Sequence, residues 1–431
     1  MDSEHPADYT WTPPQYNLLK APEASGVWEV DSSGTLKGNF PRSARWCADG
    51  TAALVQCDHR EFRILNPSAP AAQAKDSITS RDFVNTFRQP DAIVDYAWYP
   101  MSSMSSPAAF CFAASVRETP VKLLDASDGR LRASYRIVDH RERQIAPHSL
   151  AFNPTATKLY CGFEDAIEVF DVSRPGEGTR LHTVPKKSSR DGLKGRGIVS
   201  SLAFSPSYES GFYAAGTLSS TLGNIAVYSE EQGDVPVLFV EGGPKAAVTQ
   251  LQFNPMHPHI LYAAFRRYPG VWSWDLRANA SVPVQIYCPP EQKQDTNQKR
   301  RFDIDVAGRY LSHGDQEGNI SIHDLSQPDG LSLVLRYPAH KGGCSSQRPA
   351  PKANGRISDA IGAVAFHPAE PSLLSVSGSR HFADPDVVSL DSDSGSDSSD
   401  EDKSSPIIRR ATAPAVPLPK DKSVKLWNLG G

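Results

Sequence analysis

The chain has 431 residues, of which 39% are hydrophobic, 9% aromatic and 22% charged, values typical of a folded globular protein. Its net charge is −4, it contains no run of about 18 apolar residues that could form a transmembrane helix, and its acidic N-terminus lacks the regions of a signal peptide. Six scattered cysteines without a C-x-x-C motif favour free thiols in a reducing compartment over a disulfide framework or a metal site.

A pattern of alternating apolar residues, an aromatic and a turn recurs seven times. In chain order the copies are ARWCADG (44–50), DYAWYP (95–100), SLAFNP (149–154), SLAFSP (201–206), QLQFNP (250–255), FDIDVAG (302–308) and AVAFHP (363–368). The matching residues are Trp46, Trp98, Phe152, Phe204, Phe253, Ile304 and Phe366, and they are spaced by 52, 54, 52, 49, 51 and 62 residues. Such alternation predicts one β-strand per copy.

A second short strand motif follows each copy. The seven motifs are FRILN, VKLLD, IEVFD, IAVYS, VWSWD, ISIHD and VKLWN. Seven units of this period resemble the WD-repeat propeller. We therefore expect an all-β, seven-bladed WD40 β-propeller with a disordered acidic insertion in the last blade.

The chain ends in VKLWNLGG, a third strand without an outer neighbour, and residues 16–30 are available to supply that neighbour. Pairing of this kind removes an exposed sheet edge. We divide the chain into an N-terminal segment (1–40), part of which closes the last blade, a WD40 propeller (41–431), and a disordered acidic and proline-rich insertion (381–420) within blade seven.

Basic residues gather in the predicted loops. In a WD-type blade, the turns between the second and third strands and the connections between blades share one face. These loops carry Arg117, Arg136, Arg141, Lys187, Arg196, Arg266, Arg267, Lys299, Arg300, Arg301 and Arg380. A rim of clustered cations suits a phosphate backbone, and Tyr135, Tyr268 and Tyr287 are candidates for stacking on unpaired bases, worth about 1–3 kcal/mol per base. The alternative is that these are ordinary solvated loop charges.

The segment from Asp384 to Asp402 contains eight acids and neither Lys nor Arg, so the rest of the chain has a net charge of −4 + 8 = +4. Ser394, Ser398 and Ser399 each have an acid three residues later, which makes them candidate phosphorylation sites. We hold two hypotheses for this tract. It competes with nucleic acid for the basic rim, or it is a solubilising insertion without regulatory effect.

No nucleophile elbow, P-loop, metalloprotease or dinucleotide-binding motif is present. We therefore expect a scaffold and no enzyme, with no catalytic residues, metal or cofactor. His148 and His340 are expected to be structural. Four aspartates at strand ends are expected to fix turns as hydrogen-bond acceptors; they are Asp125, Asp171, Asp275 and Asp324.

Three stretches carry a more specific resemblance. They are DASDGRLRASYRIVDHRERQIAPHSLAFNPTATKLYCGFEDAIEVFDVSRPG (125–176), GIVSSLAFSPS (197–207), and WDLR (274–277) followed by TNQKRRFDIDVAGRYL (296–311). They resemble the telomerase Cajal body protein family. This resemblance implies a nuclear RNA-binding propeller that recognises small Cajal-body RNA or telomerase RNA, works with box H/ACA particles, and aids ribonucleoprotein assembly or localisation.

The resemblance places further candidate positions within its matched motifs. These are Arg132, Arg136, Arg277, Asn297, Gln298, Arg300 and Arg301, of which Arg132, Arg136 and Arg277 have blade packing as an alternative role. Together with the rim, the candidate RNA-binding set is Arg117, Arg136, Arg141, Lys187, Arg196, Arg266, Arg267, Tyr268, Arg277, Asn297, Gln298, Lys299, Arg300 and Arg301.

Two alternative functions stay open at this point. One is a pre-mRNA splicing factor associated with small nuclear ribonucleoprotein (snRNP) proteins, and the other is a protein-only WD40 interaction adaptor. In the RNA hypothesis the protein is a monomeric propeller without membrane contact. It is nuclear, in Cajal bodies or nucleoplasm, with some cytoplasmic presence allowed.

Overall fold

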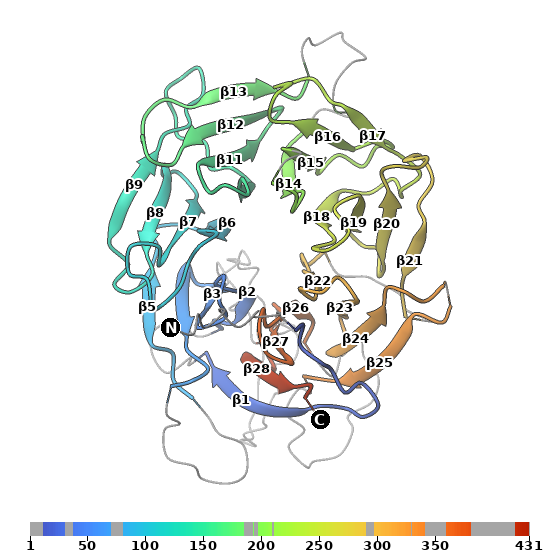
Figure 1. The fold of residues 1–431 in the computed structure, drawn as a ribbon. Helices are drawn as coiled ribbons and strands as arrows, with labels where there is room; N and C mark the ends of the chain where they lie inside the picture. The colour runs from blue at the N-terminus through green and yellow to red at the C-terminus, as the bar shows by residue number, and fades with distance from the viewer. Residues whose placement is uncertain are drawn as a thin grey trace, which may run out of the picture.

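The computed structural model describes residues 12–30, 38–69, 81–184, 193, 197–208, 211–289, 297–328, 330–340, 359–380 and 419–430. Within these ranges the chain forms 28 β-strands, arranged in seven four-stranded antiparallel sheets around a central axis (Figure 1). Among the described residues, no helix has the length and apolar character needed to cross a membrane. The prediction of an all-β, seven-bladed propeller is confirmed.

Each blade is given from its inner to its outer strand. Blades one and two are β2 Pro41–Trp46, β3 Ala53–Cys57, β4 Glu61–Leu65 and β5 Asn85–Arg88, then β6 Ile93–Trp98, β7 Cys111–Val116, β8 Val121–Asp125 and β9 Leu131–Tyr135. Blades three and four are β10 Ser149–Phe152, β11 Lys158–Phe163, β12 Ala166–Asp171 and β13 Thr179–His182, then β14 Val199–Phe204, β15 Phe212–Thr217, β16 Ile225–Ser229 and β17 Leu238–Val240.

Blades five and six are β18 Val248–Phe253, β19 Ile260–Phe265, β20 Val271–Asp275 and β21 Gln285–Tyr287, then β22 Asp303–Ile304, β23 Tyr310–Gly314, β24 Asn319–Asp324 and β25 Leu333–Pro338. Blade seven is β26 Ile361–Phe366, β27 Ser372–Ser377, β28 Ser423–Asn428 and β1 Glu23–Glu29. The acidic tract falls between β27 and β28 in the chain, outside the described residues.

The seven repeat residues identified in the sequence each end the innermost strand of a blade. Trp98 of blade two shows why: its ring belongs to a core cluster with Leu54 and Phe62 of blade one, and its Nε1 donates to Arg45 O of that blade at 2.9 Å. Because a blade cannot bury both of its faces alone, such rings fill the space between neighbouring blades. The recurring turn residue after the ring then reverses the chain into the second strand.

Blade seven combines both ends of the chain. β1 pairs antiparallel with β28, so that Trp28 lies opposite Val424 and Glu29 opposite Ser423. Trp28 is fully buried and belongs to a core cluster shared with blade one, which includes Val55 and Leu65. The ring is therefore closed by an N-terminal strand pairing with a C-terminal one.

A buried polar network also stabilises blade seven. His340 lies 3.0 Å from Asp421 Oδ2 through Nδ1 and 2.7 Å from Ser375 Oγ through Nε2, and Trp427 Nε1 donates to the same Oγ at 2.8 Å. Each link satisfies a buried polar atom. His340 is thus a structural residue, as expected.

The four aspartates at strand ends fix turns, also as expected. Each Oδ1 accepts a hydrogen bond from the backbone N–H two residues later, at 2.8–3.0 Å. This local bond holds the turn between the third and fourth strands of blades two, three, five and six.

Candidate nucleic-acid interface

The loops that carry most of the candidate cations share one face, here called the upper face. Neighbouring strands of a blade run antiparallel, so the turn after the second strand and the connection after the fourth strand emerge on the same side. Backbone hydrogen bonds join these loops: Arg117 N donates to Ala92 O at 3.0 Å, and Gln89 N to Arg60 O at 2.7 Å. Cations from different blades are thereby held on one surface.

An exposed basic cluster lies where the β19–β20 turn meets the connection from β21 to β22. We call its four residues the Arg266 cluster: Arg266, Arg267, Tyr268 and Asn297. The Arg266, Arg267 and Asn297 side chains are exposed, and Tyr268 is 40% exposed. Arg267 Nε donates to Asn297 Oδ1 at 2.6 Å. Two guanidinium groups and an accessible aromatic ring therefore occupy one solvent-facing site.

Gln298 anchors this cluster to blade seven. Its Nε2 donates to Gly378 O at 2.8 Å, and its Oε1 accepts from Ser379 Oγ at 3.1 Å. The side chain is half-buried, so Gln298 holds the connection in place and offers little free surface. Beyond it, Arg380 pairs with Asp58, with Nη2 at 3.0 Å from Oδ1.

Blades two and three carry a second group of exposed cations, Arg117, Arg136 and Arg141. Arg117 lies in the β7–β8 turn, and the other two lie in the connection from β9 to β10. A turn at Asp139 shapes this connection, since its Oδ1 accepts from the backbone N–H of Arg141 at 2.7 Å. These three side chains project from the upper face, as expected.

The triplet Lys299, Arg300 and Arg301 differs from the expected exposed rim position, because all three side chains are partly buried. The Arg301 backbone N donates to Gly362 O at 2.9 Å, which draws this stretch against β26. Its side chain is only 13% exposed, and Nη2 donates to Asp95 Oδ1 at 2.7 Å. Arg300 Nη1 donates to Gly314 O at 2.7 Å, and its buried Nε has no hydrogen-bond partner among the described residues.

Burial lowers the pKa of all three side chains of this triplet. It lowers the pKa of Lys299 to about 7, an effect that the nearby Arg301 charge increases. Burial also lowers the pKa of Arg300 to about 10. Lys299 and Arg301 line the central cavity, whereas Arg300 lines a separate pocket beside Arg266 and Tyr268. The expectation that the triplet belongs to the fully exposed rim is corrected, because all three side chains are partly buried.

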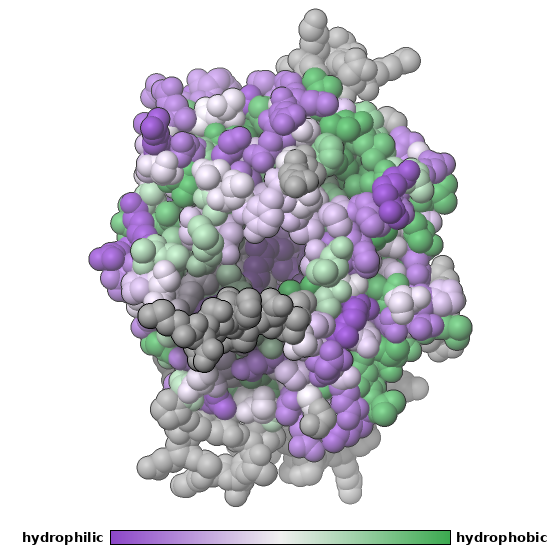
Figure 2. All heavy atoms as spheres, viewed as in Figure 1, coloured by the Kyte–Doolittle hydropathy of each residue, from purple (hydrophilic) through white to green (hydrophobic). Residues whose placement is uncertain are grey.

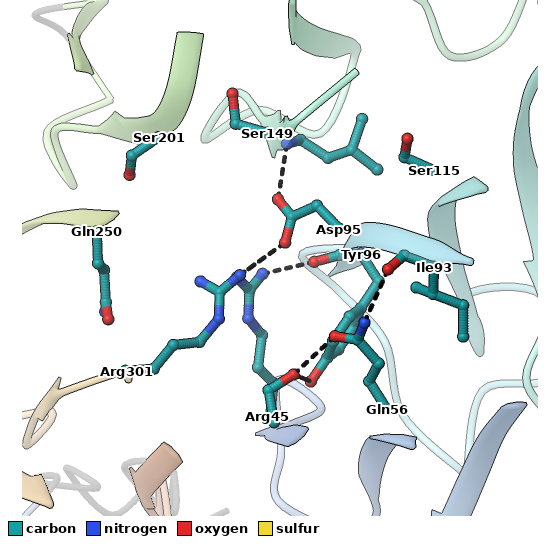
Figure 3. Close-up of polar contacts among 12 residues, drawn as sticks. Arg45, Gln56, Ile93, Asp95, Tyr96, Ser115, Ser149, Ser201, Gln250 and Arg301 are labelled. Carbon is teal, nitrogen blue, oxygen red and sulfur yellow. Dashed lines mark hydrogen bonds and ion pairs between the residues drawn. The ribbon is translucent and has the colours of Figure 1, made fainter. Parts of the chain in front are cut away.

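Figure 3 shows the interior of the ring, where the guanidinium groups of Arg45 and Arg301 extend side by side toward Asp95. Arg45 Nη1 donates to Tyr96 O at 2.6 Å, and its Nη2 lies 3.6 Å from Asp95 Oδ1. The other Asp95 oxygen accepts the backbone N–H of Leu150 at 3.0 Å. Burial opposes ionisation of Asp95, but Arg301 and Arg45 outweigh it and lower the pKa of this carboxyl group.

Sequence reasoning missed this central group, although a signal was present. Arg301 lies three residues before the repeat residue Ile304, and the same offset in other blades gives Asp95, Ser149, Ser201 and Gln250. All five line the central cavity of the ring. Counting back three residues in blades two to six would have placed Arg301 in this inner ring, although the same count in blades one and seven gives Ser43 and Ala363, which are not among its lining residues.

Comparison with known proteins shows the family to which the chain is related. It is 31% identical over 378 residues to telomerase Cajal body protein 1 of Mesocricetus auratus, a match that covers 86% of this chain and 64% of that protein. It is 30% identical over 396 residues to the Rattus norvegicus protein of the same name, covering 89% of this chain and 67% of the relative. The chain belongs to the telomerase Cajal body protein family.

Two further comparisons qualify this relationship. The chain spans 64% of the length of the Mesocricetus auratus member, and no family model matches it. A Schizosaccharomyces pombe protein named guanine nucleotide-binding protein negative regulator 1 is 28% identical over 299 residues, which is 67% of this chain and 72% of that protein. At the level common to these findings, the chain is a WD-repeat scaffold.

Two arginines in motifs that carry the telomerase Cajal body protein resemblance support local structure. Arg132 Nη2 donates to Asp125 Oδ2 at 2.7 Å and also to Pro107 O, which ties the β8–β9 hairpin to the β6–β7 loop. Arg277 lies in the β20–β21 turn on the face opposite the Arg266 cluster, and its Nη2 donates to Asp275 Oδ2 at 2.8 Å. The candidate position Arg277 is thus separate from the upper face.

Of the three tyrosines expected to stack on bases, only Tyr268 is accessible. Tyr135 is fully buried and donates its hydroxyl to Val172 O at 3.1 Å, while Tyr287 is 3% exposed. Both rings belong to the core between blades and cannot meet an RNA base. Lys187, Arg196, Ser394, Ser398 and Ser399 lie outside the described residues.

Proposed function

We propose that this chain binds small Cajal-body or small nuclear RNA, with telomerase RNA as one candidate, across its upper face. In this role it is a scaffold for ribonucleoprotein assembly or localisation, without catalysis. The observation that carries the proposal is the Arg266 cluster, an exposed pair of arginines beside an accessible tyrosine, in a chain related to proteins named for telomerase and the Cajal body.

The chemistry of the cluster suits unpaired RNA. The exposed guanidinium groups of Arg266 and Arg267 provide charge for phosphate contacts, which position an RNA without specifying its sequence. Tyr268 offers a ring face to one unstacked base, a contact worth about 1–3 kcal/mol. Asn297, held by Arg267, supplies amide N–H donors to a base edge.

The same proposal assigns location and partners. We place the protein in the nucleus, in Cajal bodies or nucleoplasm, in contact with box H/ACA or snRNP proteins. A monomeric propeller is sufficient for this role. The identity of the bound RNA separates a Cajal-body function from a splicing function.

The test uses a charge reversal that leaves the interior intact. We expect Arg266→Glu/Arg267→Glu to weaken RNA binding and to reduce the slope of log affinity against log salt by about 2, one for each lost phosphate contact. The matched control is Arg174→Glu/Lys20→Glu, which reverses two exposed cations on the opposite side of the ring, here called the lower face, and changes the net charge equally. Binding is measured by gel shift across a salt series.

In cells, RNAs crosslinked to the wild-type chain and to both variants are sequenced. We expect small nuclear or Cajal-body RNAs to be enriched with the wild type and the control but not with the Arg266/Arg267 variant. Equal enrichment with the wild type, the control and the Arg266/Arg267 variant would show that the RNA interface lies outside the Arg266 cluster. A reversal at Arg300 and Arg301 is unsuitable, because it would disrupt the buried pair with Asp95 and report on folding.

A protein-only adaptor is the second candidate, favoured by the Schizosaccharomyces pombe relative whose name describes regulation of a guanine nucleotide-binding protein. In this case no RNA class is enriched above background, and the same upper-face reversal abolishes capture of one protein partner. Steep loss of binding with salt together with RNA enrichment would exclude this second candidate.

A further inference from the structure

The seven inner strands enclose a cavity of about 540 Å³ at the centre of the ring. Figure 2 shows the ring hollowed at its centre, with hydrophilic residues deep in the opening. Small side chains create this space, since Ser149, Ser201, Ala203 and Ala365 line the wall where larger residues would close it.

The cations of the cavity gather on blades one and six. Its lining includes Arg45, Lys299 and Arg301, against the two carboxyl groups of Asp95 and Asp303. Burial raises the pKa of Asp303 to about 6, and Gln252 Nε2 donates to this carboxyl at 3.0 Å. Three cationic side chains therefore face two carboxyl groups, and positive charge exceeds negative charge in the cavity when Lys299 is protonated.

Most neutral polar groups of the wall are already engaged. Ser149 Oγ donates to Val199 O at 2.9 Å, Ser201 Oγ accepts from Leu251 N at 2.8 Å, and Gln250 Nε2 donates to Phe302 O at 2.8 Å. These bonds link consecutive blades and leave the wall groups little capacity for a ligand.

Lys299 differs from these hydrogen-bonded polar groups of the cavity wall. Within the described part of the chain, its ammonium group forms no hydrogen bond or ion pair, although the side chain is partly buried and lines the cavity. The charges of Arg301, Arg45 and Arg42 repel this ammonium group, and Asp95 offsets this repulsion only in part. A bound anion would give the Lys299 ammonium group the partner of opposite charge that the described residues do not supply.

We propose that the central cavity binds a small free anion carrying a phosphate group, held by Lys299 and by the N–H groups of Arg301 and Arg45. A guanidinium group has five N–H donors, so Arg301 and Arg45 can keep their bonds to Asp95 and Tyr96 and still face the ligand. This site is inside the ring and separate from the Arg266 cluster. The inference therefore goes beyond the proposed RNA interface.

Binding is coupled to the protonation of Lys299. The charged or titratable groups that act on it are Arg301, Asp95, Arg45, Arg42 and, in the connection from β9, His148. With the cavity empty, burial and Arg301 hold the pKa of Lys299 at about 7. A bound dianion raises this pKa, so binding at pH 8 takes up a proton.

The experiment uses the full chain, free of nucleic acid, and two probes. Inorganic phosphate tests binding by calorimetry, and inorganic sulfate tests proton uptake, because sulfate remains a dianion throughout the neutral pH range. We expect one site per chain, and Lys299→Met to weaken binding about tenfold or more through loss of a charge-assisted hydrogen bond. The matched control is Lys245→Met, which removes an exposed upper-face lysine and should leave affinity unchanged.

Two further measurements keep the inference falsifiable if a variant folds poorly. Sulfate binding to the wild-type chain at pH 8, measured in buffers of different ionisation enthalpy, should show proton uptake, and its absence would overturn the inference. The ligand-free Lys299→Met variant should melt no lower than the wild type, because it removes a charge that Arg301 and Arg45 repel. A lower melting temperature would show instead that Lys299 is needed by the fold.

RNA separates this inference from the proposed function. We expect Lys299→Met to bind RNA like the wild type, and Arg266→Glu/Arg267→Glu to bind phosphate like the wild type. If RNA displaces phosphate, or if Lys299→Met loses both ligands together, the cavity receives a phosphate of the RNA and the inference of a free ligand is wrong. If phosphate binds but RNA does not, the proposed function fails and the inference stands.

Discussion

Two histidines inside blade six provide an acid-sensitive point in the fold. The rings of His313 and His323 stack with centroids 5.3 Å apart, and their Nε2 atoms are 3.2 Å apart. Only one of these atoms can donate the shared proton, so the pair favours neutral rings. Burial lowers the pKa of His323 to about 4, and burial together with His323 lowers the pKa of His313 well below its ordinary value.

This pair predicts the direction in which stability depends on pH. An unfolded histidine titrates near pH 6.5, so between about pH 4 and pH 6.5 the unfolded chain binds protons that the folded chain does not. The free energy of unfolding should therefore rise with pH across this window, by up to about 1.4 kcal/mol per pH unit for each histidine. Asp303, with its pKa raised to about 6, acts in the opposite direction.

A comparison of variants isolates the contribution of the two histidines to the pH dependence of the free energy of unfolding. His323→Phe keeps a ring beside Tyr287, 5.7 Å away in the wild type, and removes one titrating group. Urea unfolding at pH 5, 6 and 7 should show a smaller dependence on pH for this variant, whereas His182→Gln, at an exposed position, should behave like the wild type. An undiminished dependence in His323→Phe would contradict the assignment.

Individual side-chain positions were the least predictable feature from sequence. Arg301 follows two other cations in a connection, which suggests a solvated loop, but its partner Asp95 is 206 residues away. The pairing exists only because blades two and six face each other across the ring. By contrast, the turn function of Asp275 was predictable, because its bond to Arg277 N spans two residues.

At the scale of elements, the inner strands were predictable because one repeated position is under the same packing demand in every blade. The repeat residue of each copy, aromatic in six and Ile304 in the other, occupies the same position at the end of the inner strand, and this fixes its spacing. The rim was predictable only in part. The β19–β20 turn holds Arg266 and Arg267 in solvent, whereas the connection before β22 bends inward and pairs with β26 at Arg301. Chain order alone does not distinguish these two cases.

The strand β1 is expected to contribute strongly to stability through one residue. Trp28 is fully buried between blades seven and one, and Arg81 lies over its ring at 5.6 Å. Trp28→Ala should lower the free energy of unfolding by about 3–5 kcal/mol, because it empties a packed site. Trp28→Phe should cost less, since the indole Nε1 forms no hydrogen bond with the described residues and most of the ring volume is kept.

The measurement is urea unfolding of both variants beside Tyr208→Ala, which removes an aromatic ring from a residue that is 75% exposed. We expect Tyr208→Ala to change stability by no more than about 0.5 kcal/mol. If Trp28→Ala were equally mild, β1 would be a loosely attached strand and not a part of the core.

At the scale of the whole molecule, ring closure brings distant parts of the chain together. Asn17 N donates to Leu429 O at 2.7 Å, beside the pairing of β1 with β28. The central cavity is a further product of closure, because seven inner strands line it and no single blade forms it. Local sequence patterns therefore predict the blades but not the charge distribution at their centre.

Closure predicts that the covalent ends can be moved. A circular permutant that joins residue 431 to residue 1 and opens the chain between Gly176 and Glu177, in an exposed lower-face turn, should keep the propeller. Circular dichroism and thermal melting should match the wild type to within a few degrees. A cut between Leu54 and Val55, inside the fully buried strand β3, is the contrasting case and should abolish cooperative melting.

The pairing of β1 with β28 also determines when a newly made chain can finish folding. The last residue of β1 is Glu29 and the last residue of β28 is Asn428, so the ribosome must add 399 more residues before the strands can fully pair. At about 5–20 residues per second this delay is about 20–80 s. Throughout that interval Trp28 has no complete site to occupy. The first strand of the propeller to leave the ribosome is thus among the last to be incorporated, and the ring is completed only after β28 has been made.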